Sequence, residues 1–89
     1  GKLIKSIRFQ RIGISRFTQV SIVVYDEVYM GVAARMPSDQ EYRALGRVVA
    51  LRKLFSAWSN IFTEGEQREI WDIVFEYSPK MKDAYLSTM

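Results

Sequence analysis

The sequence predicts an α+β fold: a three-stranded antiparallel meander, then a long helix and a second helix antiparallel to it. Three observations predict this fold class. The first third of the chain alternates polar and apolar residues and is rich in β-branched side chains, Pro37 ends that pattern, and two capped stretches with helical periodicity follow. A chain of 89 residues has room for one hydrophobic core, so we expect residues 1–89 to form a single domain.

Three strands are predicted, over residues 4–12, 17–25 and 28–35. In the first, Ile7 and Phe9 alternate with polar residues, which is the period of a half-buried strand. Residues 13–16 supply the first turn, and Asp26-Glu27 is expected to form the second. The third stretch is apolar at odd and even positions alike, which predicts a strand buried on both faces. Within it, Gly31 would let a helix approach closely.

Two helices are predicted after Pro37, and each begins with a capping box. Residues 38–41 (Ser-Asp-Gln-Glu) begin a helix that should run from about residue 39 to about residue 60, and residues 63–66 (Thr-Glu-Gly-Glu) begin one from about 64 to about 77. Pro79 follows and is well placed to start a short last helix through Leu86.

The apolar stripe of the first helix changes direction partway along. Leu45 and Val48 share one side, whereas Leu51, Leu54 and Phe55 centre more than about a third of a turn away. This shift predicts two contact surfaces, the sheet for the first half of the helix and the second helix for the second half. A kink near residue 50 is the alternative.

The composition excludes several kinds of chemistry. Cysteine and histidine are both absent, which removes disulfides, thiolate metal sites, thiol nucleophiles and the commonest general base. The glycines are isolated and no serine lies in a nucleophile motif. Glu69, Asp72 and Glu76 have helical spacing and could face a Mg²⁺ ion together, but a solvated helix face that offsets the helix dipole explains them better. We therefore expect a protein that is not an enzyme and has no metal or cofactor.

The charge is distributed unevenly. Residues 1–62 carry ten basic and four acidic side chains, whereas residues 63–89 carry three basic and six acidic ones. A basic face could contact a phosphate backbone or an acidic protein, and tryptophans are favoured at the centres of interfaces. The residues that we expect to bind a partner or nucleic acid are Arg8, Arg11, Arg16, Arg35, Arg43, Arg47, Trp58 and Trp71.

No apolar run approaches the roughly 18 residues of a membrane span, so we expect no membrane segment. The lack of cysteine fits a reducing compartment, and we expect a cytoplasmic location.

One stretch resembles a pattern found in small uncharacterised proteins of bacteriophages and prophages. Residues 31–39 (Gly-Val-Ala-Ala-Arg-Met-Pro-Ser-Asp) and 46–50 (Gly-Arg-Val-Val-Ala), with Lys53, match a strand ending in Gly-x-Ala, a Pro-x-Asp turn and a helix with Gly-Arg-x-x-Ala. The phage pattern often has Cys or His two residues after its second Ala, where this chain has Arg35-Met36. The resemblance covers about a quarter of the chain and implies a phage accessory protein, with no catalytic residue to transfer.

Together these features predict a small binding protein that modulates or inhibits a host protein or nucleoprotein complex, such as defence or transcription machinery, in the bacterial cytoplasm. Shape, an apolar anchor and complementary charge suffice for that role. The alternative is direct binding of DNA or RNA through a basic sheet and helix face. A homodimer that buries the region of Trp58 and Trp71 would account for the large apolar side chains without another partner.

Overall fold

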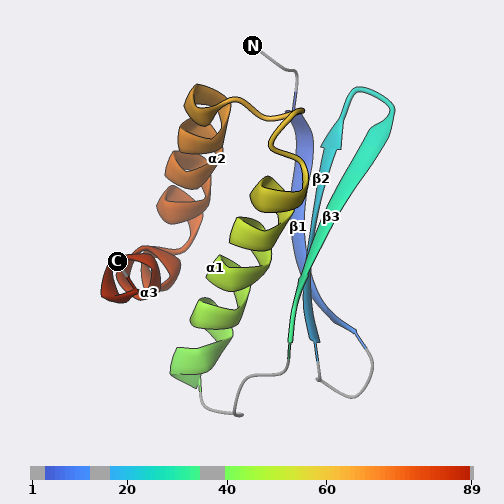
Figure 1. Ribbon diagram of the computed structural model, residues 1–89. Coiled ribbons are helices and arrows are strands. Elements are labelled where there is room, and N and C mark those ends of the chain that lie inside the picture. Colours follow the sequence, from blue (N-terminus) through green and yellow to red (C-terminus); the bar gives the residue numbers. More distant parts are fainter. Residues whose placement is uncertain (1–3, 13–16, 35–39, 89) are drawn as a thin grey trace.

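In the part of the chain that the structure describes, a three-stranded sheet carries three helices. The helices lie on one face of the sheet (Figure 1). The computed structural model describes residues 4–12, 17–34 and 40–88, and of residues 40–42 the backbone only. Its elements, in chain order, are β1 (Ile4–Ile12), β2 (Phe17–Val24), β3 (Glu27–Ala33), α1 (Gln40–Ala57), α2 (Glu64–Tyr77) and α3 (Pro79–Ser87). The α+β prediction is confirmed, including the short last helix. The predicted turn at residues 13–16 and the first capping box lie outside the described residues.

The strands form an antiparallel meander in the order β1-β2-β3, in which Phe9 pairs with Val20 and Val20 with Gly31. The turn predicted at Asp26-Glu27 is wrong by one residue, because the hairpin closes on the pair of Val24 and Glu27. Tyr25, the first residue of this turn, has a φ of 54°. Two-residue hairpin turns need such left-handed residues, which are usually Gly or Asn. A tyrosine in that position gives the sequence no signal for the turn.

An irregularity near the start of β1 determines which face its first residues occupy. Ile4 pairs with Val24 and Ser6 with Val23, so the register shifts around Lys5 as in a β-bulge. Because one residue is inserted, Ile4 and Ile7 both lie on the face of the sheet that the helices cover. The period of two in a regular strand would have placed them on opposite faces.

The face of the sheet away from the helices is open, and this corrects the prediction that the third strand is buried on both faces. Tyr29 and Ala33 are buried beneath the helices, whereas Val28, Met30 and Val32 are exposed on the other face. Strand β3 is at an edge of the sheet. Its continuous apolar character therefore reflects one buried face and one exposed apolar face.

Helix α1 lies directly on β3, as the glycine there predicted. A Cβ atom added to Gly31 would lie 2.5 Å from the carbonyl oxygen of Ala50 and 2.7 Å from the amide nitrogen of Leu54. The expectation of two contact surfaces for this helix is met only in part: the second half of α1 also contacts the sheet, at Gly31, and the helix whose backbone approaches α1 closely is α3, not the expected α2. In the same helical turns of α1 that contact Gly31, the side chain of Arg52 reaches α3. Its guanidinium lies 4.7 Å from the centre of the Tyr85 ring.

Helices α2 and α3 close the other side of the core. The second capping box is confirmed, because Thr63 and Glu66 each accept a hydrogen bond from the backbone N–H of the other. Helix α2 runs back along α1 (Figure 1), but its backbone stands off from that helix while the backbone of α3 approaches α1 closely. Met81 of α3 is fully buried as a result. The short last helix is thus part of the core.

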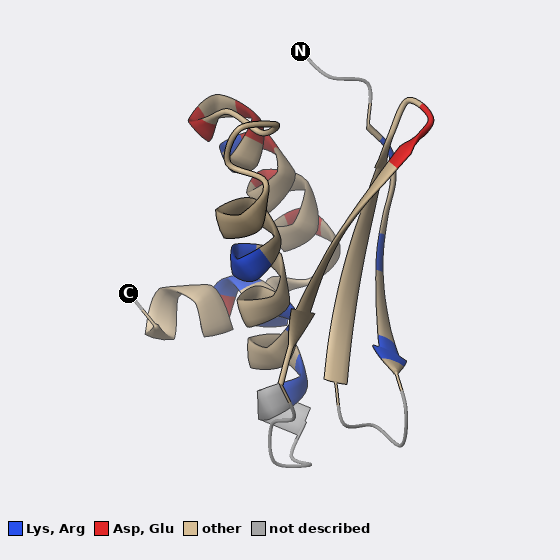
Figure 2. Ribbon diagram, turned by 45° about the vertical axis from the view of Figure 1, so that its right-hand side comes forward, with Lys and Arg blue, Asp and Glu red and all other residues tan. Residues whose placement is uncertain are grey.

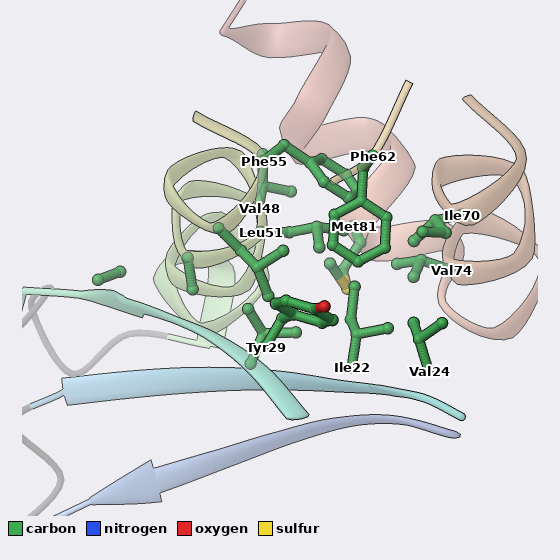
Figure 3. Close-up of a cluster of buried hydrophobic side chains, with 14 of the residues drawn as sticks. Ile22, Val24, Tyr29, Val48, Leu51, Phe55, Phe62, Ile70, Val74 and Met81 are labelled. Atoms are coloured by element: carbon green, nitrogen blue, oxygen red, sulfur yellow. The ribbon is translucent and has the colours of Figure 1, made fainter. Parts of the chain in front are cut away.

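Large side chains fill the space between α1 and α2 (Figure 3). Phe62 is 1% exposed, and its ring contacts those of Tyr29 and Phe55 edge-on, at 5.5 and 5.6 Å between centres. The chain reaches this position through a tight turn after α1, in which the amides of Ile61 and Phe62 donate to the carbonyl of Trp58. This turn brings an aromatic ring back into the core from the end of the helix.

Candidate functional site

A groove runs between β1 and the corner formed by α2 and α3. Helix α1 covers β3 and β2, so the inner face of β1 is left to face the other two helices. The hollow has a volume of about 600 Å³. Its apolar lining comes from β1 (Ile4, Ile7, Phe9), from α2 (Ile73, Val74, Tyr77) and from α3 (Met81). We call this hollow the β1–α2 groove.

Local features of the sequence build both walls of this groove. The bulge around Lys5 turns Ile4 to the inner face, beside Ile7. On the opposite wall, Ile73 and Tyr77 are four residues apart and so lie on the same face of α2. They are 40% and 85% exposed, although both are large apolar side chains. The groove is therefore a partly open apolar surface.

Basic side chains surround one end of the groove. A second hollow of about 250 Å³ adjoins it and shares Arg47 and Ser78, with Arg43 and Lys80 completing its charged lining. The guanidinium of Arg47 lies 5.8 Å from the centre of the Phe9 ring, on the floor of the groove. We call Arg43, Arg47 and Lys80 the basic rim.

The charged side chains that line the two hollows, within the described ranges, are all basic: the basic rim and Lys5. The Nζ atom of Lys5 lies 3.9 Å from a carboxylate oxygen of Asp26, and both side chains are well exposed. Figure 2 shows basic residues along β1 and α1, and acidic residues at the β2–β3 turn and along α2. The groove therefore combines an apolar surface with positive charge, which suits an anionic ligand that has apolar groups.

The structure brings together only some of the predicted site residues. Arg43 and Arg47 meet at the basic rim. Arg11 is exposed and pairs with Thr18, which places it on the same side of the sheet as Phe9. Arg8 lies on the opposite, open face of the sheet, because it alternates with Phe9. Arg16 and Arg35 lie outside the described residues.

The two tryptophans take separate positions. Trp71 is half-buried, with ring centres 5.9 Å from Phe55 and 4.8 Å from Tyr85. Trp58 is 37% exposed and meets the Tyr29 ring edge-on at 5.0 Å. Trp71 is therefore mainly a core residue, and Trp58 covers one side of Tyr29.

Sequence reasoning missed the apolar part of the groove. Tyr77 ends the predicted second helix with nothing in the sequence to mark it as exposed, and Ile4 carried no signal because the bulge is not visible in the sequence. The one available clue was the surplus of large apolar side chains, and this surplus did not indicate where on the molecule they would be exposed.

The acidic residues considered for metal-dependent chemistry do not gather. Glu69, Asp72 and Glu76 are exposed on α2. Among the residues that the structure describes, no three His, Cys, Asp or Glu side chains come together where a metal ion could be held. Across the same residues, no helix has the length and apolar character needed to cross a bilayer.

Tyr29 has a perturbed ionisation that can be measured. Its hydroxyl donates a hydrogen bond to the carboxylate of Glu27. That hydrogen bond, the desolvation of the ring and the negative charge of Glu27 raise the pKa of Tyr29 above its ordinary value of 10.0. As the pH rises, Tyr29 therefore ionises first in the unfolded chain. Its hydrogen bond stabilises the folded state fully below about pH 10, and this stabilisation is lost as the pH rises through the raised pKa.

We expect the unfolding free energy of the wild type, relative to that of Tyr29→Phe, to stay level up to about pH 10 and to fall as the pH rises further. Urea titrations at several pH values measure this difference. A difference that stays constant as the pH rises further would contradict the hydrogen bond to Glu27.

No protein-family model, curated protein sequence or solved structure matches this chain.

Proposed function

We propose that this chain is a non-enzymatic binding domain that holds an acidic, partly apolar segment of another protein in the β1–α2 groove. The observation that carries the proposal is the combination of exposed apolar side chains with a lining whose described charges are all basic. A hydrophobic anchor flanked by complementary charge is the usual arrangement of a protein-recognition site.

The apolar walls would supply most of the affinity. Removing one Leu or Ile side chain of a partner from water contributes about 1.5–3 kcal/mol, and each exposed charge pair contributes about 0.2–1 kcal/mol. Ordering the bound segment opposes these gains. We therefore expect a short peptide to bind with a Kd in the range of about 10–500 µM, and a whole protein partner to bind more tightly.

The basic rim would determine which segments bind. An acidic residue of the partner would meet Arg47 beside the apolar floor, with Arg43 and Lys80 within the adjoining hollow. A segment with basic residues at the same places would bring like charges together, which disfavours it. That a host protein of bacteria supplies the segment, and that the chain comes from a phage, remain predictions from the short resemblance of residues 31–50.

Nucleic acid is the second candidate, because Arg11, Arg43 and Arg47 are exposed and Arg11 shares the helix-covered side of the sheet. A phosphate backbone has no apolar groups that would pack against the apolar walls of the groove. Arg8 lies on the face of the sheet away from the helices, and so does not add to the basic residues at the groove. We therefore favour the protein segment.

Fluorescence anisotropy with a short labelled peptide that alternates glutamate and leucine tests the proposal. Arg47→Glu and Lys80→Glu should each weaken binding by about five- to tenfold, which corresponds to about 1–1.4 kcal/mol. Two matched controls have the same change of charge on the same helices: Lys53→Glu on α1 and Lys82→Glu on α3, residues that line neither hollow. These controls should change binding less than twofold or so.

Three results would overturn the proposal. The peptide could fail to bind at about 1 mM. The rim variants could bind it as their matched controls do. A labelled oligothymidylate could bind instead, with an affinity that falls steeply with salt, and this result would establish the nucleic-acid alternative.

A further inference from the structure

The outer edge of β1 borders the β1–α2 groove and has no strand beside it among the described residues. There β1 pairs with β2 alone, and it comes first in the order β1-β2-β3. The irregularity around Lys5 interrupts the ladder at the start of the strand, so the regular part of the edge runs over residues 6–12. An edge strand carries a row of backbone N–H and C=O groups that another segment can pair with. The edge therefore offers hydrogen bonds in addition to the side chains of the groove.

The register of the β2–β3 hairpin shows to which side each residue of β2 bonds. In an antiparallel ladder, pairs that exchange backbone hydrogen bonds alternate with pairs that do not. The turn between β2 and β3 closes on Val24 and Glu27, and the closing pair of such a two-residue turn is a hydrogen-bonded one. By alternation Ile22 and Val20 also bond to β3. The residues between them on β2 therefore bond to β1.

On β1, the outward backbone groups belong to residues whose side chains lie on the inner face. Arg8 and Gln10 are opposite those residues of β2 that bond to β1, so their N–H and C=O groups are used within the sheet. Ile7, Phe9 and Arg11 alternate with them and turn both groups to the free edge. Ile7 and Phe9 also line the groove. The same two residues thus present hydrogen bonds at the edge and apolar side chains to the groove.

An extended segment beside β1 would cover apolar side chains that the groove leaves exposed. Directly opposite residues of two strands share a face, so residues of the segment opposite Ile7 and Phe9 would direct their side chains into the groove. There they would meet the exposed Ile73 and Tyr77 of α2. A fourth strand would therefore extend the sheet beneath α2 and α3.

The charges around this edge favour an acidic segment. The other, outward-facing residues of the segment would lie on the open face of the sheet beside the exposed Arg8, where opposite charges on neighbouring strands stabilise the pairing. The basic rim lies towards the end of β1, because Arg43 is one turn nearer than Arg47 to the start of α1, and α1 starts at the end of the molecule where β1 finishes (Figure 1). Acidic residues that flank the paired stretch at this end would reach the rim.

We propose that the acidic segment binds in an extended conformation, as a fourth strand antiparallel to β1, a mode of binding that rests on the function proposed above. Backbone hydrogen bonds at the edge supply affinity, and alternating apolar and acidic side chains supply specificity. The antiparallel direction continues that of the sheet, and antiparallel pairs are slightly more stable per residue than parallel ones. A helical segment could fill the groove, but it would leave the outward groups of Ile7 and Phe9 unpaired.

Hydrogen exchange of the backbone amides, measured by NMR with and without the peptide that alternates glutamate and leucine, tests the added strand. In the free protein the amides of Ile7, Phe9 and Arg11 should exchange fast, and saturating peptide should slow them by about tenfold or more. Met30 and Val32 are the matched control, because alternation turns their amides outward at the other edge of the sheet, where they should stay fast. Slow exchange of the β1 set in the free protein, or fast exchange of this set in the complex, would overturn the proposal.

Two methylated forms of the same peptide provide a second test. An N-methyl group removes a hydrogen-bond donor, and in the proposed complex the leucine amides face β1 while the glutamate amides face solvent. Methylation of the leucine amides should weaken binding at least about tenfold, and methylation of the glutamate amides less than about twofold. Weakening by both sets would indicate a helix, and weakening by neither would mean that side chains alone bind. Weakening by the glutamate set alone would indicate a parallel strand, and each of these three results would overturn the proposal.

Arg8→Glu probes the outward-facing side chains, because Arg8 lines neither hollow. The variant should weaken binding by about two- to fivefold, whereas Lys82→Glu should change it less than about twofold. Equal effects of the two variants would contradict the position of the glutamates beside Arg8. A peptide that does not bind at all would overturn the proposed function and the strand together. A peptide that binds without protecting the edge amides of β1 would overturn the strand alone.

Discussion

Gly31→Ala is expected to lower the free energy of unfolding by about 3 kcal/mol, although alanine is favoured over glycine within a strand. The new Cβ atom would lie 2.5 Å from the carbonyl oxygen of Ala50 and 2.7 Å from the amide of Leu54. Both are backbone atoms of a helix, which cannot move aside as a flexible side chain can. The loss from overpacking therefore exceeds the gain of about 0.5–1 kcal/mol from reduced chain entropy in the unfolded state.

Gly65→Ala is the matched control, because it is the same substitution in open space. The nearest atom to its new Cβ would be the Thr63 hydroxyl oxygen, at 4.0 Å. The position lies within α2, so alanine should raise stability by about 0.5 kcal/mol. Urea unfolding of both variants gives the comparison, and a Gly31→Ala protein as stable as the wild type would show that α1 is not seated on β3.

Phe62→Ala should lower the free energy of unfolding by about 3–5 kcal/mol, which is as much as Gly31→Ala or more. The ring is 1% exposed and lies against Tyr29 and Phe55, so its removal leaves a cavity at the point where the sheet, α1 and α2 meet. A domain of this size is stable by only about 5–10 kcal/mol, so the variant should be partly unfolded near its working temperature. Urea unfolding measures the loss.

Trp58→Ala serves as the control for Phe62→Ala. Trp58 also contacts Tyr29, but it is 37% exposed, so its loss should cost about 1 kcal/mol. Equal losses for the two variants would mean that Phe62 does not fill the centre of the core.

The fold could be read from the sequence wherever a local pattern had one physical meaning. The alternation in residues 17–25 predicted a strand, which the structure has over Phe17–Val24, and the Thr63 capping box placed the start of α2 at its observed residue. Gly31 was correctly predicted to admit a helix, because a glycine within a strand can mark a place where another backbone approaches closely. These features depend on residues close together in the chain.

Features that depend on distant contacts could not be read in this way. Nothing near Met81 indicates that the last helix, rather than α2, approaches α1 most closely. The left-handed Tyr25 and the bulge around Lys5 lack the residues that usually mark them, so the turn was misplaced and the groove was missed. The apolar residues of β3 predicted burial on both faces because a sequence cannot distinguish a covered face from an open one.

The strand order β1-β2-β3 also bears on how fast the chain folds. Each strand pairs with the one that precedes or follows it, and α1 then packs on β3, the element immediately before it. Most of the interfaces therefore form between neighbouring segments, and the loops that must close are short. Loop-closure entropy is the main barrier to assembling a sheet, so such a topology belongs with domains that fold within about milliseconds rather than seconds.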